Sequence, residues 1–251
     1  MLDDPVLASF LRVLFRKTCY AVAPREQITL ALEEVKARAL LEGPVSEVHL
    51  RVAGTFERVF LDLADDTWEA MEITPDGFHP TLRHPHFVRG KGMKPLPRPL
   101  EGGTLLEEMR PFLPPMSEDY TALILGWLVG ATLPSGPYPV LVINGGHGSG
   151  KSTTMAMLRE ILDPHARGLR EPGNDPRDWV AAIKNGYILA LDNVSFFQKW
   201  MSDFLCRVAT GGVIGGRLLF TNHGEASFAV CRPIMFNGIP NVVERGDLAD
   251  R

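Results

Sequence analysis

The sequence predicts an α/β fold in which helices flank a parallel sheet, preceded by a smaller α+β amino-terminal region. Three continuous apolar runs are typical of strands buried on both faces. They cover residues 140–143, 187–191 and 233–236. Helical patterns over Lys151 to Leu162 and Pro176 to Lys184 lie between these runs, and such alternation favours a mostly parallel sheet. Residues 45–90 instead alternate apolar and polar side chains, which predicts a small antiparallel β unit.

The chain is expected to divide near residue 115. Helical spacing of apolar residues covers 5–42, ahead of the β unit, and a segment rich in Pro and Gly follows over 90–115. A further helix is predicted over 118–133. We therefore predict an accessory domain over residues 1–115 and a core domain over 116–251.

Composition excludes several classes of protein. The 251 residues are 45% hydrophobic and 22% charged, as in soluble globular proteins, and a net charge of −4 excludes a polycation that coats nucleic acid. Three cysteines without metal-ligand spacing indicate a reducing compartment. The acidic start is unlike a secretory signal, and the longest apolar run, 121–133, is too short to cross a bilayer. We expect a cytoplasmic protein without a membrane segment.

A glycine-rich loop follows the first apolar strand. The spacing G-x-x-x-x-G-K-[ST] runs from Gly145 to Ser152, with a strand before it and a helix after it. Its backbone N–H groups are expected to contact the phosphates of ATP, with Lys151 reaching the β- and γ-phosphates and Ser152 binding Mg²⁺. His147 is either catalytic or the occupant of a variable position. The predicted ATP-binding residues are Gly145, Gly146, His147, Gly148, Ser149, Gly150, Lys151, Ser152 and Thr153.

Polar residues end the two later strands. Asp192 follows an apolar strand, where phosphate-loop enzymes place the carboxylate that supports Mg²⁺; capping the next helix is the alternative. Asn193 stands where many ATPases have a glutamate that activates water. Because an amide cannot be a general base, Asn193 would orient the water or another carboxylate would serve. Asn237 either holds the attacking water or the γ-phosphate, or makes a turn with Gly238.

Two segments are candidates for contact with nucleic acid. Residues 217–230 contain two apolar runs around Asn-His-Gly-Glu, which predicts a hairpin with His223 at its tip, either in a pore or as a plain surface turn. Residues 77–98 carry five basic and no acidic side chains, with Arg89, Lys91 and Lys94 among them. This segment either follows a phosphate backbone or is a solvated basic loop.

Together, these motifs resemble the AAA+ ATPases, specifically the superfamily 3 helicase-like branch found in replication proteins of phages, plasmids and mobile elements. The resemblance covers residues 138–251 and includes GGHGSGKSTT, LALDNVS, PIMFNGI and ERGDLADR. It implies a ring, commonly a hexamer, with ATP between neighbouring subunits, Asp192 on Mg²⁺ and Asn237 sensing the γ-phosphate. Arg245 or Arg251 would be the arginine finger, and His223 would sit on the pore hairpin.

The chain departs from this branch in two respects. Asn193 replaces a second acidic residue, and the sequence stops at Arg251, where the family continues into a further strand and a helical lid. We therefore expect a fragment in which ATP binding is a safer expectation than turnover. The predicted function is an ATPase motor, helicase- or translocase-like, acting on single-stranded DNA. The alternatives are a switch that remodels or recruits a protein partner and, third, a small-molecule kinase.

Overall fold

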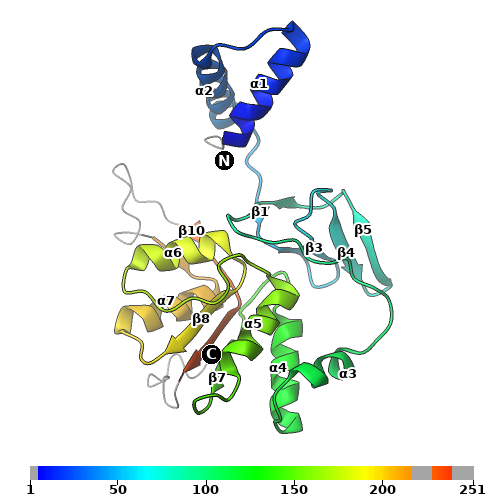
Figure 1. Ribbon diagram of the computed structural model, residues 1–251, viewed down its shortest axis with the longest axis vertical. Coiled ribbons are helices and arrows are strands. Elements are labelled where there is room, and N and C mark those ends of the chain that lie inside the picture. The colour runs from blue at the N-terminus through cyan, green and yellow to red at the C-terminus, as the bar shows by residue number, and fades with distance from the viewer. Residues whose placement is uncertain (1–4, 216–227, 239–251) are drawn as a thin grey trace. The chain divides into compact units, whose positions relative to one another are not determined.

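The chain forms two compact units, Met1–Glu47 and Val48–Arg251, in a computed structural model that describes residues 5–215 and 228–238 (Figure 1). The boundary between the units follows residue 47, which is earlier in the chain than the predicted domain boundary. Residue 115 lies inside the second unit. The first unit is a pair of helices, as the helical spacing predicts. They are α1 (Pro5–Cys19) and α2 (Arg25–Leu41). Tyr20, with a φ of 54°, ends α1, since left-handed backbone cannot continue a right-handed helix.

The second unit begins with the predicted antiparallel β unit. Four strands pair in the order β2-β3-β4-β5, and two short strands, β1 and β6, pair in parallel beside them. The strands are β1 (Val48–His49), β2 (Val52–Gly54), β3 (Val59–Asp62), β4 (Ala70–Thr74), β5 (Gly77–Thr81) and β6 (His86–Phe87). A turn at Pro75-Asp76 joins β4 to β5, and Gly77 has a φ of 133° that a side chain would disfavour. The connector contains two short helical turns, α3 (Leu105–Met109) and η1 (Arg110–Phe112).

A parallel three-stranded sheet forms the centre of the remainder, as predicted. Its order is β7-β11-β8, so the last strand in the chain lies between the other two. The strands are β7 (Val140–Asn144), β8 (Leu189–Val194) and β11 (Ile234–Gly238). The helices are α4 (Glu118–Gly130), α5 (Lys151–Leu162), α6 (Pro176–Asn185) and α7 (Lys199–Thr210). The predicted bounds of α5 are those observed.

Hydrophobic cores cover both faces of this sheet. Ala190 and Met235 pack on the face of α4 and α5, whereas Leu191 and Phe236 pack on the face of α6 and α7 (Figure 1). Successive residues of β8 therefore point to opposite sides, as the period of a strand requires. This alternation decides which side chains meet the phosphate loop.

One further segment extends the sheet edge beyond β8. Arg170 pairs in parallel with Leu191: its N–H donates to Ala190 O at 3.1 Å, and its carbonyl accepts from Asp192 N at 2.6 Å. This segment thus contributes a single bridge to the sheet. No helix in the described part of the chain is long and apolar enough to cross a membrane.

A buried ion pair ties the antiparallel sheet to the end of α5. Arg51 is fully buried, with its Nε 3.4 Å from Asp163 Oδ1. Its other nitrogens donate to the carbonyls of Asp62 and Lys94, at 3.0 and 2.9 Å. Burial lowers the pKa of Arg51, and the charge of Asp163 opposes that shift. The predicted accessory and core regions therefore share a polar centre within the second unit.

Candidate nucleotide-binding site

The phosphate loop connects β7 to α5. Gly148 and Gly150 have φ angles of 72° and 78°, a left-handed conformation that favours glycine. A Cβ on Gly145 would lie 2.7 Å from Ser149 Oγ, so a side chain at that position would require the Ser149 hydroxyl to move. Five residues of the loop are exposed, and Thr153 on the first turn of α5 is exposed as well. The five are Gly146, His147, Gly148, Ser149 and Ser152. The loop thus leaves its backbone accessible at the start of a helix, where anions bind.

The side chain of Lys151 folds back over the loop that precedes it. Its Nζ donates to the carbonyl oxygens of Gly145 and Gly146, at 2.8 and 2.7 Å. These acceptors lie in the loop that the lysine follows, so the ammonium group is held over the loop opening. A phosphate oxygen is a stronger, charged acceptor for the same ammonium group. The position fits the predicted role of Lys151 with the β- and γ-phosphates.

Three polar side chains from three elements meet beside the loop. Ser152, on α5, donates from Oγ to Asp192 Oδ1 at 2.7 Å. The amide nitrogen of Asn237, on β11, donates to the same carboxylate oxygen at 2.6 Å and lies 3.3 Å from Ser152 Oγ. The cluster spans 85 positions of sequence between Ser152 and Asn237. Residues singled out separately in the sequence therefore form one site.

This donor set fits Mg²⁺. A hydroxyl and a carboxylate oxygen lie 2.7 Å apart, and hard oxygen ligands are those that Mg²⁺ prefers. The described residues contain no group of three or more His, Cys, Asp or Glu that could hold a metal ion by themselves. Mg²⁺ bound with a nucleotide does not need such a group, because waters and substrate phosphates fill most of its positions. Ser152 and Asp192 are the residues that would hold it.

Asn193 contributes through its backbone. Its N–H donates to Asn237 Oδ1 at 2.7 Å, and its φ of 55° is left-handed. Asn is among the few residues that adopt this conformation readily. The Asn193 side chain is exposed and lines a cavity of about 270 Å³ together with Glu171. Glu171 is the carboxylate that lines this cavity with Asn193.

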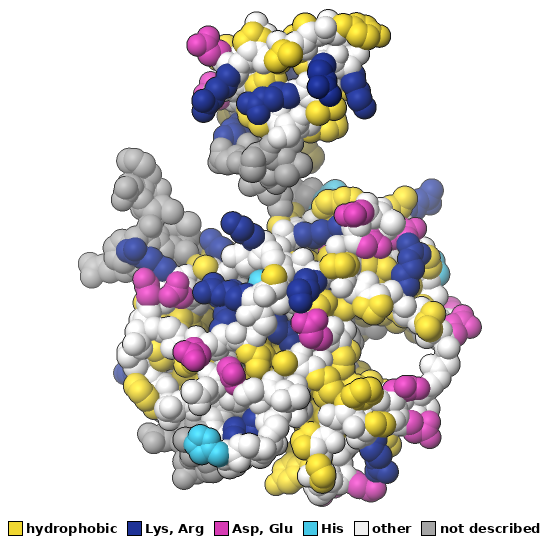
Figure 2. Space-filling model, viewed as in Figure 1, with side chains coloured by type: hydrophobic (Ala, Val, Ile, Leu, Met, Phe, Trp, Pro, Cys, Tyr) yellow, Lys and Arg dark blue, Asp and Glu magenta, His cyan; other side chains and the backbone are white. Residues whose placement is uncertain are grey.

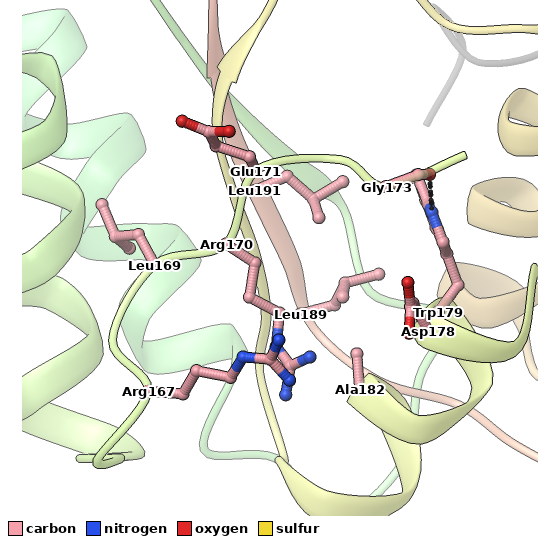
Figure 3. Close-up of a pocket in the computed structure, with 10 residues that line it drawn as sticks. All are labelled: Arg167, Leu169, Arg170, Glu171, Gly173, Asp178, Trp179, Ala182, Leu189 and Leu191. Carbon is pink, nitrogen blue, oxygen red and sulfur yellow. Dashed lines mark hydrogen bonds between the residues drawn. The ribbon is translucent and has the colours of Figure 1, made fainter. Parts of the chain in front are cut away.

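Glu171 is a site residue that the sequence reasoning missed. Because Arg170 pairs with Leu191, Glu171 stands beside Asp192 on the adjacent edge segment, and paired residues of neighbouring strands face the same side. Figure 3 shows the Glu171 carboxylate directed away from the side chain of Arg170. Glu171 thus shares the sheet face on which Asp192 meets Ser152.

The predicted nucleic-acid residues of the basic segment differ in availability. Arg89 is held by Asp62, with nitrogen–oxygen distances of 2.8 and 3.1 Å, and its guanidinium lies 3.9 Å from the centre of the Trp68 ring. Its charge is therefore already paired. Lys91 and Lys94 are exposed, and Lys94 Nζ lies 3.8 Å from Glu160 in an exposed ion pair. Figure 2 shows Lys and Arg side chains gathered near the upper middle of the second unit on the face drawn.

Other predicted residues lie outside the described part of the chain. They are His223, Arg245 and Arg251. The described flanks of the predicted hairpin are β9 (Val213–Ile214) and β10 (Phe228–Ala229), which pair antiparallel. Strand β9, the partner of β10, therefore lies before residue 217, where the predicted hairpin begins. The tip with His223 and both candidate arginine fingers remain predictions.

Comparison with known proteins supplies a biological context. Residues 113–251 match the family model described as actinomycete integrative conjugative element replication protein. No curated protein matches the chain. The matched residues include the phosphate loop, Asp192 and Asn237, and they make up more than half of the 251 residues. The chain therefore belongs to the family of replication proteins of actinomycete integrative conjugative elements.

Proposed function

We propose that this replication protein binds and hydrolyses ATP and uses the reaction to act on DNA. The observation that carries the proposal is the cluster of Ser152, Asp192 and Asn237 beside the phosphate loop, with 2.7 and 2.6 Å hydrogen bonds to Asp192. A loop alone would account for phosphate binding. A carboxylate and an amide held next to its serine favour a site that also acts on the γ-phosphate.

The strand order supports an AAA+ type of ATPase. With β11 between β7 and β8, Asn237 comes from the strand that touches both the loop strand and the Asp192 strand. This position supports the proposal that its side chain contacts the γ-phosphate while it is hydrogen-bonded to Asp192. The edge segment at Arg170 continues the same parallel arrangement outward. A small-molecule kinase has no need of such an amide.

In the proposed reaction, Glu171 accepts the proton that Asn193 cannot. A water oxygen forms a bond to the γ-phosphorus while its proton passes to the Glu171 carboxylate. The bond from the γ-phosphorus to the β–γ bridging oxygen breaks, and the electron pair stays on ADP. Lys151 balances the charge on the β- and γ-phosphates, and Asn237 holds the γ-phosphate or the water. Mg²⁺ at Ser152 and Asp192 would neutralise further phosphate charge.

We further propose that neighbouring subunits complete the site in a ring. In this proposal the backbone N–H groups of the loop and the cluster contact one side of the nucleotide, whereas the exposed loop residues leave the other side open to solvent. An arginine from a neighbour, Arg245 or Arg251, would stabilise the charge that develops on the transferring phosphoryl group. This part of the proposal concerns residues outside the described ranges.

The decisive experiment measures ATP hydrolysis with and without single-stranded DNA. We expect a basal rate that single-stranded DNA raises, and no rise in His223→Ala. Duplex DNA at the same nucleotide concentration is the control for non-specific polyanion effects. Hydrolysis that no DNA changes would favour remodelling of a protein partner. Absence of ATP binding by the wild type would contradict the nucleotide site itself.

A further inference from the structure

A second cavity lies on the other face of the sheet edge. It has a volume of about 390 Å³ and lies between α6 and the segment that carries Arg167 and Arg170 (Figure 3). Leu189 and Leu191 of β8 form part of its wall, and both belong to the core of α6 and α7. Asp192 points to the opposite face, toward Ser152. This cavity therefore lies on the other face of the sheet from the Ser152–Asp192 contact, and Glu171 is the residue of the candidate nucleotide site that also lines it.

Two arginine side chains enter this cavity. Figure 3 shows the guanidinium groups of Arg167 and Arg170 next to each other, and their charges are close enough to interact. Burial lowers the pKa of the half-buried Arg170, and the charge of Arg167 lowers it further. Among residues 5–215 and 228–238, no hydrogen bond or ion pair joins either guanidinium to a carboxylate. The charge of Asp178, which also lines the cavity, acts against the lowering.

The lining of the cavity contains two arginines and two acidic residues, Glu171 and Asp178, and the two guanidinium groups lie next to each other. Glu171 is directed away from the arginines in Figure 3, so Asp178 is the carboxylate that faces them across the cavity. Two like charges held together in a partly desolvated site repel each other, and an anion between them relieves that repulsion. Guanidinium groups present paired N–H donors that match phosphate oxygens. The apolar wall adds room for a group that is not charged.

We infer that this cavity binds the sugar–phosphate backbone of single-stranded DNA. The inference rests on the proposed DNA function, which the family of replication proteins supports. Arg167 and Arg170 hold one or two phosphate groups, and the apolar wall contacts the adjoining sugar. The contact reads no base, because backbone phosphates are the same in every sequence.

The test compares binding of a labelled oligothymidine by fluorescence anisotropy over a range of salt concentrations. In Arg167→Ala/Arg170→Ala we expect at least tenfold weaker binding and a salt slope shallower by about 0.7 to 1.4, since each of the one or two single-strand phosphate contacts contributes about 0.7. Arg38→Ala/Arg110→Ala removes the same charge from exposed ion pairs elsewhere and is expected to keep the wild-type affinity. ATP binding measured on each variant confirms that the site on the other face is intact.

A variant that is expected to strengthen DNA binding distinguishes loss of the contact from misfolding. Asp178→Asn removes the opposing carboxylate and is expected to tighten DNA binding several-fold, a gain that a damaged fold does not produce. If the wild type binds DNA and the double alanine variant binds equally well, the inference is wrong and the proposed function stands. A wild type that binds no DNA contradicts both. Equal competition by polyglutamate would assign the cavity to an acidic protein segment and overturn the inference.

Discussion

Asn237 fixes the orientation of Asp192 by using both ends of its own amide. Its nitrogen donates to Asp192 Oδ1 at 2.6 Å, and its oxygen accepts the backbone N–H of Asn193 at 2.7 Å. Asn237 is itself 1% exposed, so neither bond has water as a ready replacement. The carboxylate next to the phosphate loop is thereby held in one position before any nucleotide arrives, which is the preorganisation that charge stabilisation requires.

Asn237→Ala is expected to lower the rate of ATP hydrolysis by roughly 100-fold, the usual effect of losing one preorganised donor. It also leaves the N–H of Asn193 without its acceptor, at a cost of about 1–3 kcal/mol in the free energy of unfolding. Steady-state hydrolysis and urea unfolding measure the two effects. Asn185→Ala, at the end of α6, is the control. A normal hydrolysis rate in Asn237→Ala would remove Asn237 from the site.

Lys151→Ala removes the ammonium group that is held at 2.8 and 2.7 Å over the loop carbonyls. A charged hydrogen bond contributes about 1.5–3 kcal/mol, so ATP affinity is expected to fall roughly 10- to 100-fold. Titration with a fluorescent ATP analogue measures the change, and Lys17→Ala on α1 is the control. ATP affinity that survives the change would contradict the assigned phosphate site.

Glu171→Gln separates binding from turnover. The amide keeps the size of the side chain but cannot accept a proton, so hydrolysis is expected to fall roughly 10²- to 10⁴-fold while ATP affinity changes little. Rapid-mix hydrolysis and nucleotide titration check the two quantities. Glu160→Gln, an exposed residue of α5 in an ion pair with Lys94, is the matched control. Wild-type turnover in Glu171→Gln would require another proton acceptor.

Arg51→Met tests the buried ion pair with Asp163. Removing one partner leaves a buried charge, and the free energy of unfolding is expected to fall by about 3–5 kcal/mol. The double variant Arg51→Met/Asp163→Asn should lose less than the sum of the two single variants, because both take part in one interaction. Urea unfolding measures all three. Arg38→Met, in an exposed pair with Glu34, should cost no more than about 1 kcal/mol.

His165 makes stability depend on pH. The ring is 3% exposed, and burial lowers its pKa below the ordinary value of 6.5, aided by the charge of Arg159. The unfolded chain therefore binds a proton near pH 6 that the folded chain does not, so stability falls as pH falls below 6.5. His165→Asn is expected to reduce this slope in urea unfolding between pH 7 and 5. His86→Asn, an exposed position, serves as control, and an unchanged slope in His165→Asn would contradict the assignment.

The sequence predicted the parts of the site that depend on local pattern. The loop spacing, the bounds of α5 and the polar residues after two strands are all set by neighbouring positions. Carboxyl ends of parallel strands meet at one edge, so Asp192 and Asn237 were expected near the loop. Local pattern does not show which side chains are in contact. The strand order β7-β11-β8 brings Asn237 next to Asp192.

The surroundings of the other site residues depend on contacts with residues that are far away in the sequence. Arg89 looked like part of an open basic segment, yet Asp62, 27 positions earlier, holds it. Glu171 has no local feature that marks it, and only the bridge from Arg170 to Leu191 brings it beside Asp192. Arg51 likewise gains its role from Asp163, 112 positions away. Such contacts follow from the fold rather than from nearby residues.

The helix α5 has a fixed anchor at each end. It starts at Lys151, over the phosphate loop, and after twelve residues, about 18 Å, it reaches the Arg51–Asp163 pair. Because a helix is stiff along its axis, the phosphate loop and the Arg51–Asp163 pair are held at a fixed separation. The antiparallel sheet is thus joined to the start of the loop's helix through one continuous rigid element.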